Sequence, residues 1–257
     1  MIRILVTGSD GQLGKCIQKI VPKYSKFEFV FHNSKTFDIT NPELITEVFS
    51  KENFDYCINC AAYTNVEQAE KTPKLAFAIN AEAVRHLSLA CFEYKVSLVH
   101  ISTDYVFDGE KKSPYTTSDK TNPINEYGKS KLAGERHIQN NLKEHFIIRT
   151  SWLYSEFGKN FYKTIVEKAK TESVLNITDE QTGCPTNANN LAAYILNLVA
   201  RNGKNYGIQH FTDGEAMTWY DFAKLILKEN KLDKNVRLDR AKNYRTFAKR
   251  PRRSILE

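Results

Sequence analysis

The chain has 257 residues, 41% of them hydrophobic, and a formal net charge of +7. This length supports one large domain, or one with a small satellite, and no apolar run approaches the roughly 20 residues that span a bilayer. The five cysteines are irregularly spaced, which argues against a disulfide framework. The first expectation is therefore a soluble cytoplasmic protein with no membrane partner.

Short apolar segments alternate with longer amphipathic segments through the first part of the chain. Residues 75–94 form the clearest predicted helix, with apolar side chains at helical spacing. Such alternation predicts a parallel sheet with helices on both faces, that is, a Rossmann-like doubly wound α/β fold. The predicted strands are residues 2–6, 27–31, 56–60, 97–101 and 146–148.

A glycine loop follows the first predicted strand, with Gly8, Gly11 and Gly14 spaced three residues apart. Gly8 can take backbone angles that a side chain would forbid, Gly11 lets a pyrophosphate approach the backbone, and Gly14 lets the next helix pack closely. The phosphates would then lie at the positive N-terminus of that helix. An ordinary glycine-rich turn is the alternative, but the strand before and the helix after favour a dinucleotide site.

The end of the second predicted strand bears on the choice of cofactor. An NAD site usually has an acid there, which binds the ribose 2′-hydroxyl. Here Lys35 follows the strand closely and no acid comes before Asp38. The sequence therefore favours NADPH, with NADH as the alternative. Asp38 would lie over the adenine or, equally well, cap a helix that begins near Pro42.

Cys57 and Cys60 have the spacing of a redox pair. A redox pair begins a helix, where the helix dipole lowers the thiol pKa, whereas these two lie in an apolar strand pattern. We therefore expect buried structural cysteines. The six histidines lack metal-ligand spacing, so no metal site is expected.

Polar and small residues follow the third and fourth predicted strands. Ser102, Thr103 and Asp104 end the fourth strand, and residues 59–64 end the third. Ligands gather at the carboxyl ends of parallel strands, where a hydroxyl can bond a carbonyl oxygen that is becoming an alkoxide. The small residues of the third strand end would let a cofactor ribose lie against the backbone.

Tyr127 and Lys131 lie four residues apart at the start of a predicted helix, so they share one face. A phenol is a poor acid at neutral pH unless its anion is stabilised, and a nearby ammonium would lower its pKa. Taken alone, this spacing is common in surface pairs. Together with the glycine loop and residues 102–104, it predicts a nicotinamide-dependent oxidoreductase with Tyr127 as proton donor.

The alternation of strands and helices loosens after about residue 154. Residues 189–200 and 219–228 predict helices, but the strands shorten. We expect a cofactor domain at 1–154 and a smaller, mainly substrate-binding region at 155–257 that returns in part to the main sheet. Basic residues near the C-terminus favour a small polyanion such as a nucleotide diphosphate over a nucleic acid. They are Arg245, Lys249, Arg250, Arg252 and Arg253.

Together these motifs resemble the extended short-chain dehydrogenase/reductase superfamily and, within it, the dTDP-4-dehydrorhamnose reductase family. The resemblance spans nearly the whole chain, and its later motifs are specific to the reductase branch. It implies reduction of the 4-keto group of dTDP-4-dehydrorhamnose to dTDP-L-rhamnose by hydride transfer from NADPH. The matching stretches are residues 7–14, 59–64, 102–107, 127–135, 149–154, 158–161, 179–186 and 250–254.

The resemblance also implies a role for each matched site residue. Tyr127, Lys131 and Thr103 would be catalytic, with Thr103 tuning the match between Tyr127 and the ketone. The cofactor would contact Gly8, Asp10, Gly11, Gln12, Leu13, Asp38, Ile39, Ala61, Ala62, Tyr63, Ser102, Tyr127 and Lys131. The sugar nucleotide would contact Thr103, Asp104, Trp152, Asn160 and Arg250. The alternative for Trp152 is a core tryptophan, and for Arg250 a solvated basic tail.

The sequence departs from the family at two places. It stops at Glu257, where family members usually continue into another helix, so the resemblance does not identify the residues that would close the substrate site. The first helical turn has Lys15 and no acid, whereas some members dimerise through a magnesium ion held partly by an acid there, so no metal is carried over. A homodimer remains one expectation. The alternative functions are another nucleotide-sugar 4-keto reductase or epimerase, and a non-catalytic reductase-like regulatory subunit.

Overall fold

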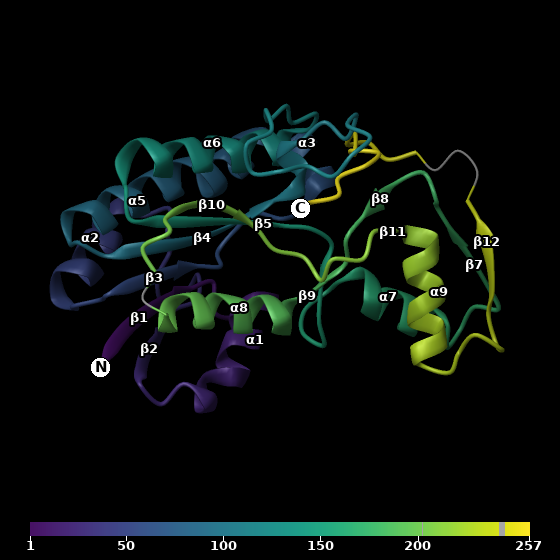
Figure 1. The fold of residues 1–257 in the computed structure, drawn as a ribbon, viewed down its shortest axis with the longest axis horizontal. Coiled ribbons are helices and arrows are strands. Elements are labelled where there is room, and N and C mark those ends of the chain that lie inside the picture. The colour runs from purple at the N-terminus through teal and green to yellow at the C-terminus, as the bar shows by residue number, and fades with distance from the viewer. Residues whose placement is uncertain (202, 242–244) are drawn as a thin grey trace.

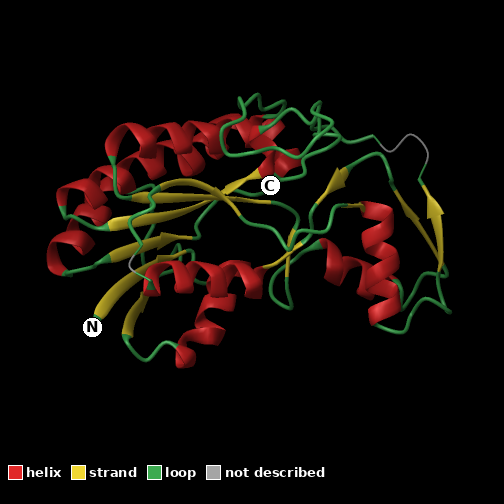
Figure 2. Ribbon diagram, in the orientation of Figure 1, coloured by secondary structure: helices red, strands yellow, loops and turns green. Residues whose placement is uncertain are grey.

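The computed structural model describes residues 1–201, 203–241 and 245–257, and its centre is a six-stranded parallel sheet (Figures 1 and 2). The strand order is β2–β1–β3–β4–β5–β10, so the direction of winding reverses between β1 and β3. In such sheets ligands bind at the carboxyl ends of the strands beside this reversal. The strands are β1 (Ile2–Thr7), β2 (Phe27–Phe31), β3 (Tyr56–Asn59), β4 (Ser97–Thr103), β5 (His145–Thr150) and β10 (Gly207–His210).

Helices cover both faces of the sheet, because alternate side chains of each strand point to opposite faces. Ile4 and Val6 pack under one pair of helices, whereas Leu5 packs under the other three. The pair is α1 (Gln12–Ile20) and α8 (Ala188–Ala200). The other three are α2 (Pro42–Lys51), α5 (Ala83–Glu93) and α6 (Glu126–Asn141). The doubly wound α/β prediction is confirmed.

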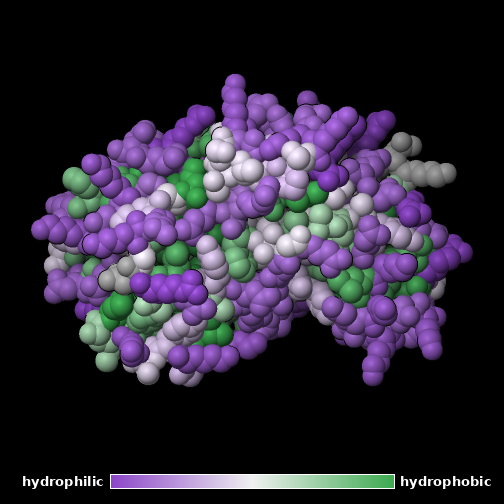
Figure 3. Space-filling model, viewed as in Figure 1, coloured by the Kyte–Doolittle hydropathy of each residue, from purple (hydrophilic) through white to green (hydrophobic). Residues whose placement is uncertain are grey.

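A smaller layer lies beside the main sheet (Figure 1), and we call it the satellite. Its core is an apolar cluster that includes Ile165, Leu175, Phe222 and Ile226. The space-filling view shows a largely hydrophilic face with a notch between the main layer and the satellite (Figure 3). The elements of the satellite are α7 (Phe161–Lys168), β7 (Val174–Ile177), β8 (Thr182–Gly183), β11 (Met217–Thr218), α9 (Trp219–Glu229) and β12 (Arg237–Arg240).

The second half of the chain contributes to both layers. The short strands β6 (Leu153–Tyr154) and β9 (Thr186–Asn187) pair where the chain crosses between them. The chain then returns to the main layer for α8 and β10 before it enters α9. The boundary at residue 154 stays a prediction.

The predicted helix at residues 75–94 is observed as three connected segments. Its middle turn is a π-helix, in which the Asn80 side chain is buried. The Asn80 amide accepts a hydrogen bond from Tyr63 N and donates to Tyr63 O and to Ser130 Oγ. The π turn therefore fixes the loop that follows β3. The segments are α4 (Pro73–Phe77), the π turn η2 (Ala78–Glu82) and α5.

By length and composition this run, Pro73–Glu93, could cross a membrane. However, half of its most apolar window is buried inside the protein, as in the core helix of a soluble protein. The remaining short helical elements lie in connections. They are η1 (Val21–Lys23), α3 (Val66–Lys71) and η3 (Asp104–Val106).

Candidate active site

The glycine loop between β1 and α1 has the predicted geometry. Gly8 has a φ of +63°, and a Cβ atom there would lie 2.6 Å from the backbone nitrogen of Ala61. The helix α1 begins directly after Gly11, and among the described residues no side chain caps its N-terminus. Free backbone N–H groups and the helix dipole therefore face an opening where an anion would be stabilised.

A cavity of about 270 Å³ extends from this loop toward the end of β2. The Asn33 side chain donates to Asp10 Oδ2 over 2.8 Å and closes one side. Asp38 lines the cavity, but it does not cap α2, because Asn41 does so by accepting from Glu43 N and Leu44 N. The capping alternative for Asp38 was therefore wrong. Predicted residues in the lining are Gly8, Asp10, Gly11, Asp38, Ile39, Ala61 and Ala62.

A second cavity, of about 600 Å³, lies at the carboxyl ends of β3, β4 and β5. Its walls combine the glycine loop with the start of α6, so a cofactor and a proton donor can meet there. Predicted residues in its lining are Gly11, Gln12, Leu13, Ala61, Ala62, Ser102, Thr103, Asp104, Tyr127, Lys131, Trp152 and Asn160. We call this space the Tyr127 cavity. Tyr63 lines neither this cavity nor the one near β2.

The start of α6 places Tyr127. Asn125 caps the helix by accepting from Gly128 N over 2.7 Å. A Cβ at Gly128 would overlap the carbonyl oxygen of Tyr105, so glycine allows the helix to lie against the end of β4. Burial raises the pKa of Tyr127 above its usual value, and a hydrogen bond with Thr103 opposes this rise.

Lys131 is buried one turn further along α6, with 2% of its surface exposed. Its Nζ donates to Ile101 O over 2.6 Å and lies 3.2 Å from His100 Nε2. Burial lowers the pKa of Lys131 to about 8. We expected a Lys131 ammonium to lower the pKa of Tyr127; instead burial dominates both groups, and the Lys131 amine is held by β4.

Asp104 is buried between two hydroxyls. Thr103 Oγ1 donates to Asp104 Oδ1 over 3.1 Å, and Ser254 Oγ donates to Asp104 Oδ2 over 2.5 Å. Burial raises the pKa of the Asp104 carboxyl to about 7, although both hydrogen bonds act to lower it. The end of β4 therefore presents a hydroxyl and a carboxyl that titrates near neutral pH.

Ser102 differs from the prediction. Its hydroxyl donates to Glu135 Oε1 over 2.5 Å, and Glu135 forms a buried bidentate pair with Arg149. A buried carboxylate needs every available donor, so the proton of Ser102 is directed to Glu135 and not to a ligand. Ser102 lines the Tyr127 cavity without offering this proton to it.

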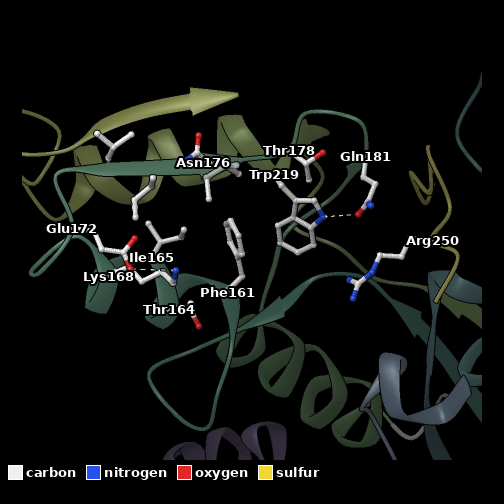
Figure 4. Close-up of a pocket in the computed structure, with 13 residues that line it drawn as sticks. Phe161, Thr164, Ile165, Lys168, Glu172, Asn176, Thr178, Gln181, Trp219 and Arg250 are labelled. Carbon is white, nitrogen blue, oxygen red and sulfur yellow. Dashed lines mark hydrogen bonds and ion pairs between the residues drawn. The ribbon is translucent and has the colours of Figure 1, made fainter. Parts of the chain in front are cut away.

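A third cavity, of about 490 Å³, lies in the satellite, and we call it the Trp219 cavity (Figure 4). Figure 4 shows Phe161, Trp219 and Arg250 on its wall. Arg250 Nη2 contacts Glu67 Oε1 of α3 at 2.8 Å, so it is not a solvated tail residue. The Trp219 ring stacks on Trp152 with centroids 3.5 Å apart. Because Trp152 lines the Tyr127 cavity, the two indoles separate neighbouring cavities.

The side chain of Asn160 forms hydrogen bonds to other residues of the protein. It caps α7 by accepting from Lys163 N, and its amide donates to Gln12 Oε1 over 2.8 Å and to Ser155 O. These contacts tie the satellite to the glycine loop. To donate to a sugar nucleotide, the Asn160 amide nitrogen would have to give up one of them, whereas Oδ1 keeps a second lone pair that can accept from a sugar hydroxyl.

A family model described as the RmlD substrate binding domain matches residues 2–257. The dTDP-4-dehydrorhamnose reductase of Aggregatibacter actinomycetemcomitans is 36% identical over 267 residues, covering 100% of this chain and 91% of that protein. The chain belongs to the dTDP-4-dehydrorhamnose reductase family.

Solved structures of reductase family members share this fold over the whole chain. A dTDP-4-dehydrorhamnose reductase from Clostridium acetobutylicum superposes with a TM-score of 0.95 at 38% identity, covering 100% of this chain and 90% of that one. One from Bacillus anthracis, solved in complex with NADP, superposes with a TM-score of 0.95 at 35% identity, covering 100% and 91%.

Several cavity residues in this member of the reductase family escaped the sequence prediction. Trp219 and Phe161 lie in helices whose apolar pattern resembles ordinary core packing. Only the fold stacks Trp219 on Trp152 and packs Phe161 against Trp219. Lys159 lines the Tyr127 cavity and adjoins the predicted Asn160, so the motif at 158–161 could have revealed it. His100 lies behind Lys131, inside a strand pattern that gave no sign of function.

Cys57 lies in β3 and Cys60 directly follows it. Cys57 is buried, as expected of a structural cysteine, whereas Cys60 is partly exposed and lines both cavities beside the glycine loop. Both thiols are free, and burial raises the pKa of each. Over residues 1–201, 203–241 and 245–257, no group of three or more His, Cys, Asp or Glu side chains could hold a metal ion.

Proposed function

We propose that this protein is a dTDP-4-dehydrorhamnose reductase, which uses NADPH to reduce the 4-keto sugar of dTDP-4-dehydrorhamnose to dTDP-L-rhamnose. The observation that carries the proposal is the Tyr127 cavity. It joins the glycine loop, where a dinucleotide would bind, to a phenol, a lysine and a threonine at a strand end. Hydride donor and proton donor can therefore reach one carbonyl group.

The cofactor would span the two cavities on either side of the glycine loop. The uncapped N-terminus of α1 fits a pyrophosphate, and the cavity near β2 fits an adenosine. Asn33 and Ser34 line that cavity and Lys35 follows them. No acid therefore stands where its charge would repel a 2′-phosphate. This arrangement favours NADPH, the reduced form of the nucleotide bound by the Bacillus anthracis relative.

The sugar nucleotide would occupy the Tyr127 and Trp219 cavities together. The stacked indoles of Trp152 and Trp219 would adjoin the sugar and the rest of the nucleotide respectively. Arg250 places a cation at the Trp219 cavity, where it suits a diphosphate. Thr103 and Asp104 would contact the sugar.

The proposed reaction assigns each residue a task. Bound NADPH would supply the hydride to C4 of the sugar. Tyr127 donates its phenolic proton to the developing alkoxide, and Thr103 orients the phenol through their hydrogen bond. Lys131 stabilises the resulting phenolate when it carries a proton. The partly buried site limits water near these groups.

The proposal is tested by following NADPH oxidation with dTDP-4-dehydrorhamnose and identifying the product as dTDP-L-rhamnose. Parallel assays with UDP- and GDP-linked 4-keto sugars, and with NADH, test the base and the cofactor. Activity on a UDP- or GDP-sugar with none on the dTDP-sugar would replace the substrate. No turnover on any of them, with NADPH still bound, would point to a non-catalytic regulatory subunit.

We further propose that the protein acts in the cytoplasm on a soluble nucleotide sugar, without nucleic acid or membrane partners, and that it forms a homodimer. The basic residues close to Arg250 fit a diphosphate ligand. Light scattering of the purified protein would test the dimer, and a monomer at micromolar concentration would contradict it.

A further inference from the structure

A row of buried polar side chains lies behind Lys131. Thr7, Asn59 and His100 are cross-strand neighbours on β1, β3 and β4, and each is at most 1% exposed. Thr7 Oγ1 donates to Asn59 Oδ1 over 2.7 Å, and Asn59 Nδ2 lies 3.1 Å from His100 Nδ1. His100 Nε2 is in turn 3.2 Å from Lys131 Nζ.

The orientation of the Asn59 amide is determined by a backbone group. Ala61 N–H can only donate, and it lies 3.2 Å from Asn59 Oδ1. The oxygen of the amide must therefore be on that side, which leaves Nδ2 facing His100. Because Nδ2 also can only donate, His100 Nδ1 must accept.

This acceptor role decides where the single proton of a neutral imidazole is. Complete burial lowers the pKa of His100 well below its usual value, so the ring is neutral. Its proton is then on Nε2, which faces Lys131 Nζ. An ammonium has no lone pair to accept this N–H, whereas a neutral amine has one.

We propose that His100, held in its Nε2–H tautomer by Thr7 and Asn59, is a positioning residue that donates to Lys131 and favours the neutral amine in the cofactor-free protein. Glu135 on α6 acts in the opposite direction, because its carboxylate favours the ammonium. The thiol of Cys60, after β3, stays neutral because burial raises its pKa. Tyr127 lies one turn away on the same helix, and His145 faces His100.

The consequence for turnover rests on the proposed function. Lys131 must be an ammonium to stabilise the phenolate of Tyr127. By favouring the amine, His100 sets the pH above which turnover falls. A protonated Lys131 requires His100 to change its tautomer or turn away from Asn59.

The tautomer can be measured directly in the cofactor-free protein by two-bond ¹H–¹⁵N correlation of the histidine rings. At a pH above the Lys131 pKa of about 8, where the amine is neutral, we expect the Nε2–H form for His100. Two other histidines, the buried His145 and the partly buried His210, provide matched controls of opposite sign. His145 Nδ1 is 2.5 Å from Leu142 O and His210 Nδ1 is 3.1 Å from Tyr115 O, and a carbonyl only accepts, so both should be Nδ1–H.

Asn59→Asp tests the effect on Lys131. It keeps the acceptor for Ala61 N–H but places a second acceptor opposite His100, which should convert His100 to the Nδ1–H form. His100 Nε2 then accepts from an ammonium, and the pKa of Lys131, followed by its ¹³Cε shift, should rise by about one unit. The alkaline limb of turnover should move by the same amount.

The added carboxylate would also raise this pKa through its charge alone, and a double variant separates the two effects. If His100 transmits the change, Asn59→Asp made in a His100→Gln background should give a much smaller shift than Asn59→Asp alone. An equal shift in both backgrounds, or an Nδ1–H form of His100 in the unaltered protein above pH 8, overturns the proposal.

These ring and lysine measurements require no substrate. They therefore judge His100 even if the protein fails to reduce any 4-keto sugar, a failure that bears only on the proposed function. The wild-type tautomer also remains decisive if His100→Gln does not fold.

Discussion

The Tyr127 cavity and the Trp219 cavity adjoin at one stacked pair of indoles, yet their walls differ in kind. Around Tyr127, the start of α6 and the segment that follows β4 present buried groups that titrate or hold protons, such as Lys131 and Asp104. Around Trp219, two helices and a short strand contribute rings and aliphatic side chains together with polar ones such as Lys168 and Glu172, and Arg250 lies at one side. The difference suggests that chemistry is assigned to the rigid sheet, and recognition to the smaller layer.

The two layers also hold their charges differently. In the main layer, Glu135 and Arg149 form an ion pair whose side chains are 0% and 3% exposed. In the satellite, Arg240 pairs with Asp179 while 64% of the arginine side chain is exposed. Buried charges must stay paired, whereas an exposed pair is screened by water. This contrast can be tested by removing one partner from the buried ion pair and one from the exposed ion pair.

The largest expected effect is on turnover in the Tyr127 cavity. Tyr127→Phe should lower kcat by about 10²–10⁴, because the proton donor is lost while the ring still fills its place beside Tyr105. NADPH affinity, measured by fluorescence titration, should change little. Unchanged kcat would remove Tyr127 from the mechanism and weaken the contrast between the two cavities.

The next effect is on stability. Arg149→Met leaves the buried Glu135 carboxylate without its partner and should lower the free energy of unfolding by about 3–5 kcal/mol. Arg240→Met, the exposed control, should cost about 1 kcal/mol or less. Urea denaturation measures both. Equal losses would show that burial does not distinguish the two ion pairs.

A pH-dependent effect should follow from Asp104. Its pKa is raised from 3.8 to about 7 in the folded protein, so its stabilising contribution is present below pH 3.8 and is lost as the pH rises through 7. Asn cannot ionise. Between pH 3.8 and about 7 the free energy of unfolding of Asp104→Asn should therefore rise by about 2–4 kcal/mol relative to that of wild type. Thermal unfolding between pH 4 and 8 measures it.

Asp108 offers a control of opposite sign. A hydrogen bond from Tyr115 is the main reason that the pKa of Asp108 is lowered, so its contribution is present above the unfolded pKa and lost as the pH falls. Asp108→Asn should therefore destabilise the protein at neutral pH and matter less in acid. If both variants showed the same pH trend, the raised pKa of Asp104 would be contradicted.

The smallest expected effect concerns recognition in the Trp219 cavity. Trp219→Ala removes the stacked partner of Trp152, a contact worth about 0.5–1.5 kcal/mol, and should raise KM for the sugar nucleotide about tenfold. Because Tyr127 is untouched, kcat should stay within about twofold. Leu225→Ala, at an exposed position of the same helix, is the control. A fall in kcat with no change in KM would place Trp219 in catalysis.

Structural features that depend on neighbouring residues in the sequence were predicted most accurately. Strands β1 to β5 were predicted at nearly their observed bounds, since a run of branched residues between turns marks a buried strand, whereas β10 was not predicted. Gly8 was predicted from its place after β1, and its positive φ follows from that turn. Residues tied to distant partners were less predictable. Ser102 was expected to face a ligand, but Glu135, 33 residues away, takes its hydroxyl.

The sequence by itself determined the Tyr127–Lys131 pair, because a four-residue spacing on a helix places two side chains on one face whatever surrounds them. It also predicted that their helix would meet the strand ends and the glycine loop at one site. Only the tertiary structure decided which protons the pair can hold. The alignment of β1, β3 and β4 brings Thr7, Asn59 and His100 into a row, and hydrogen-bond donors must meet acceptors along it.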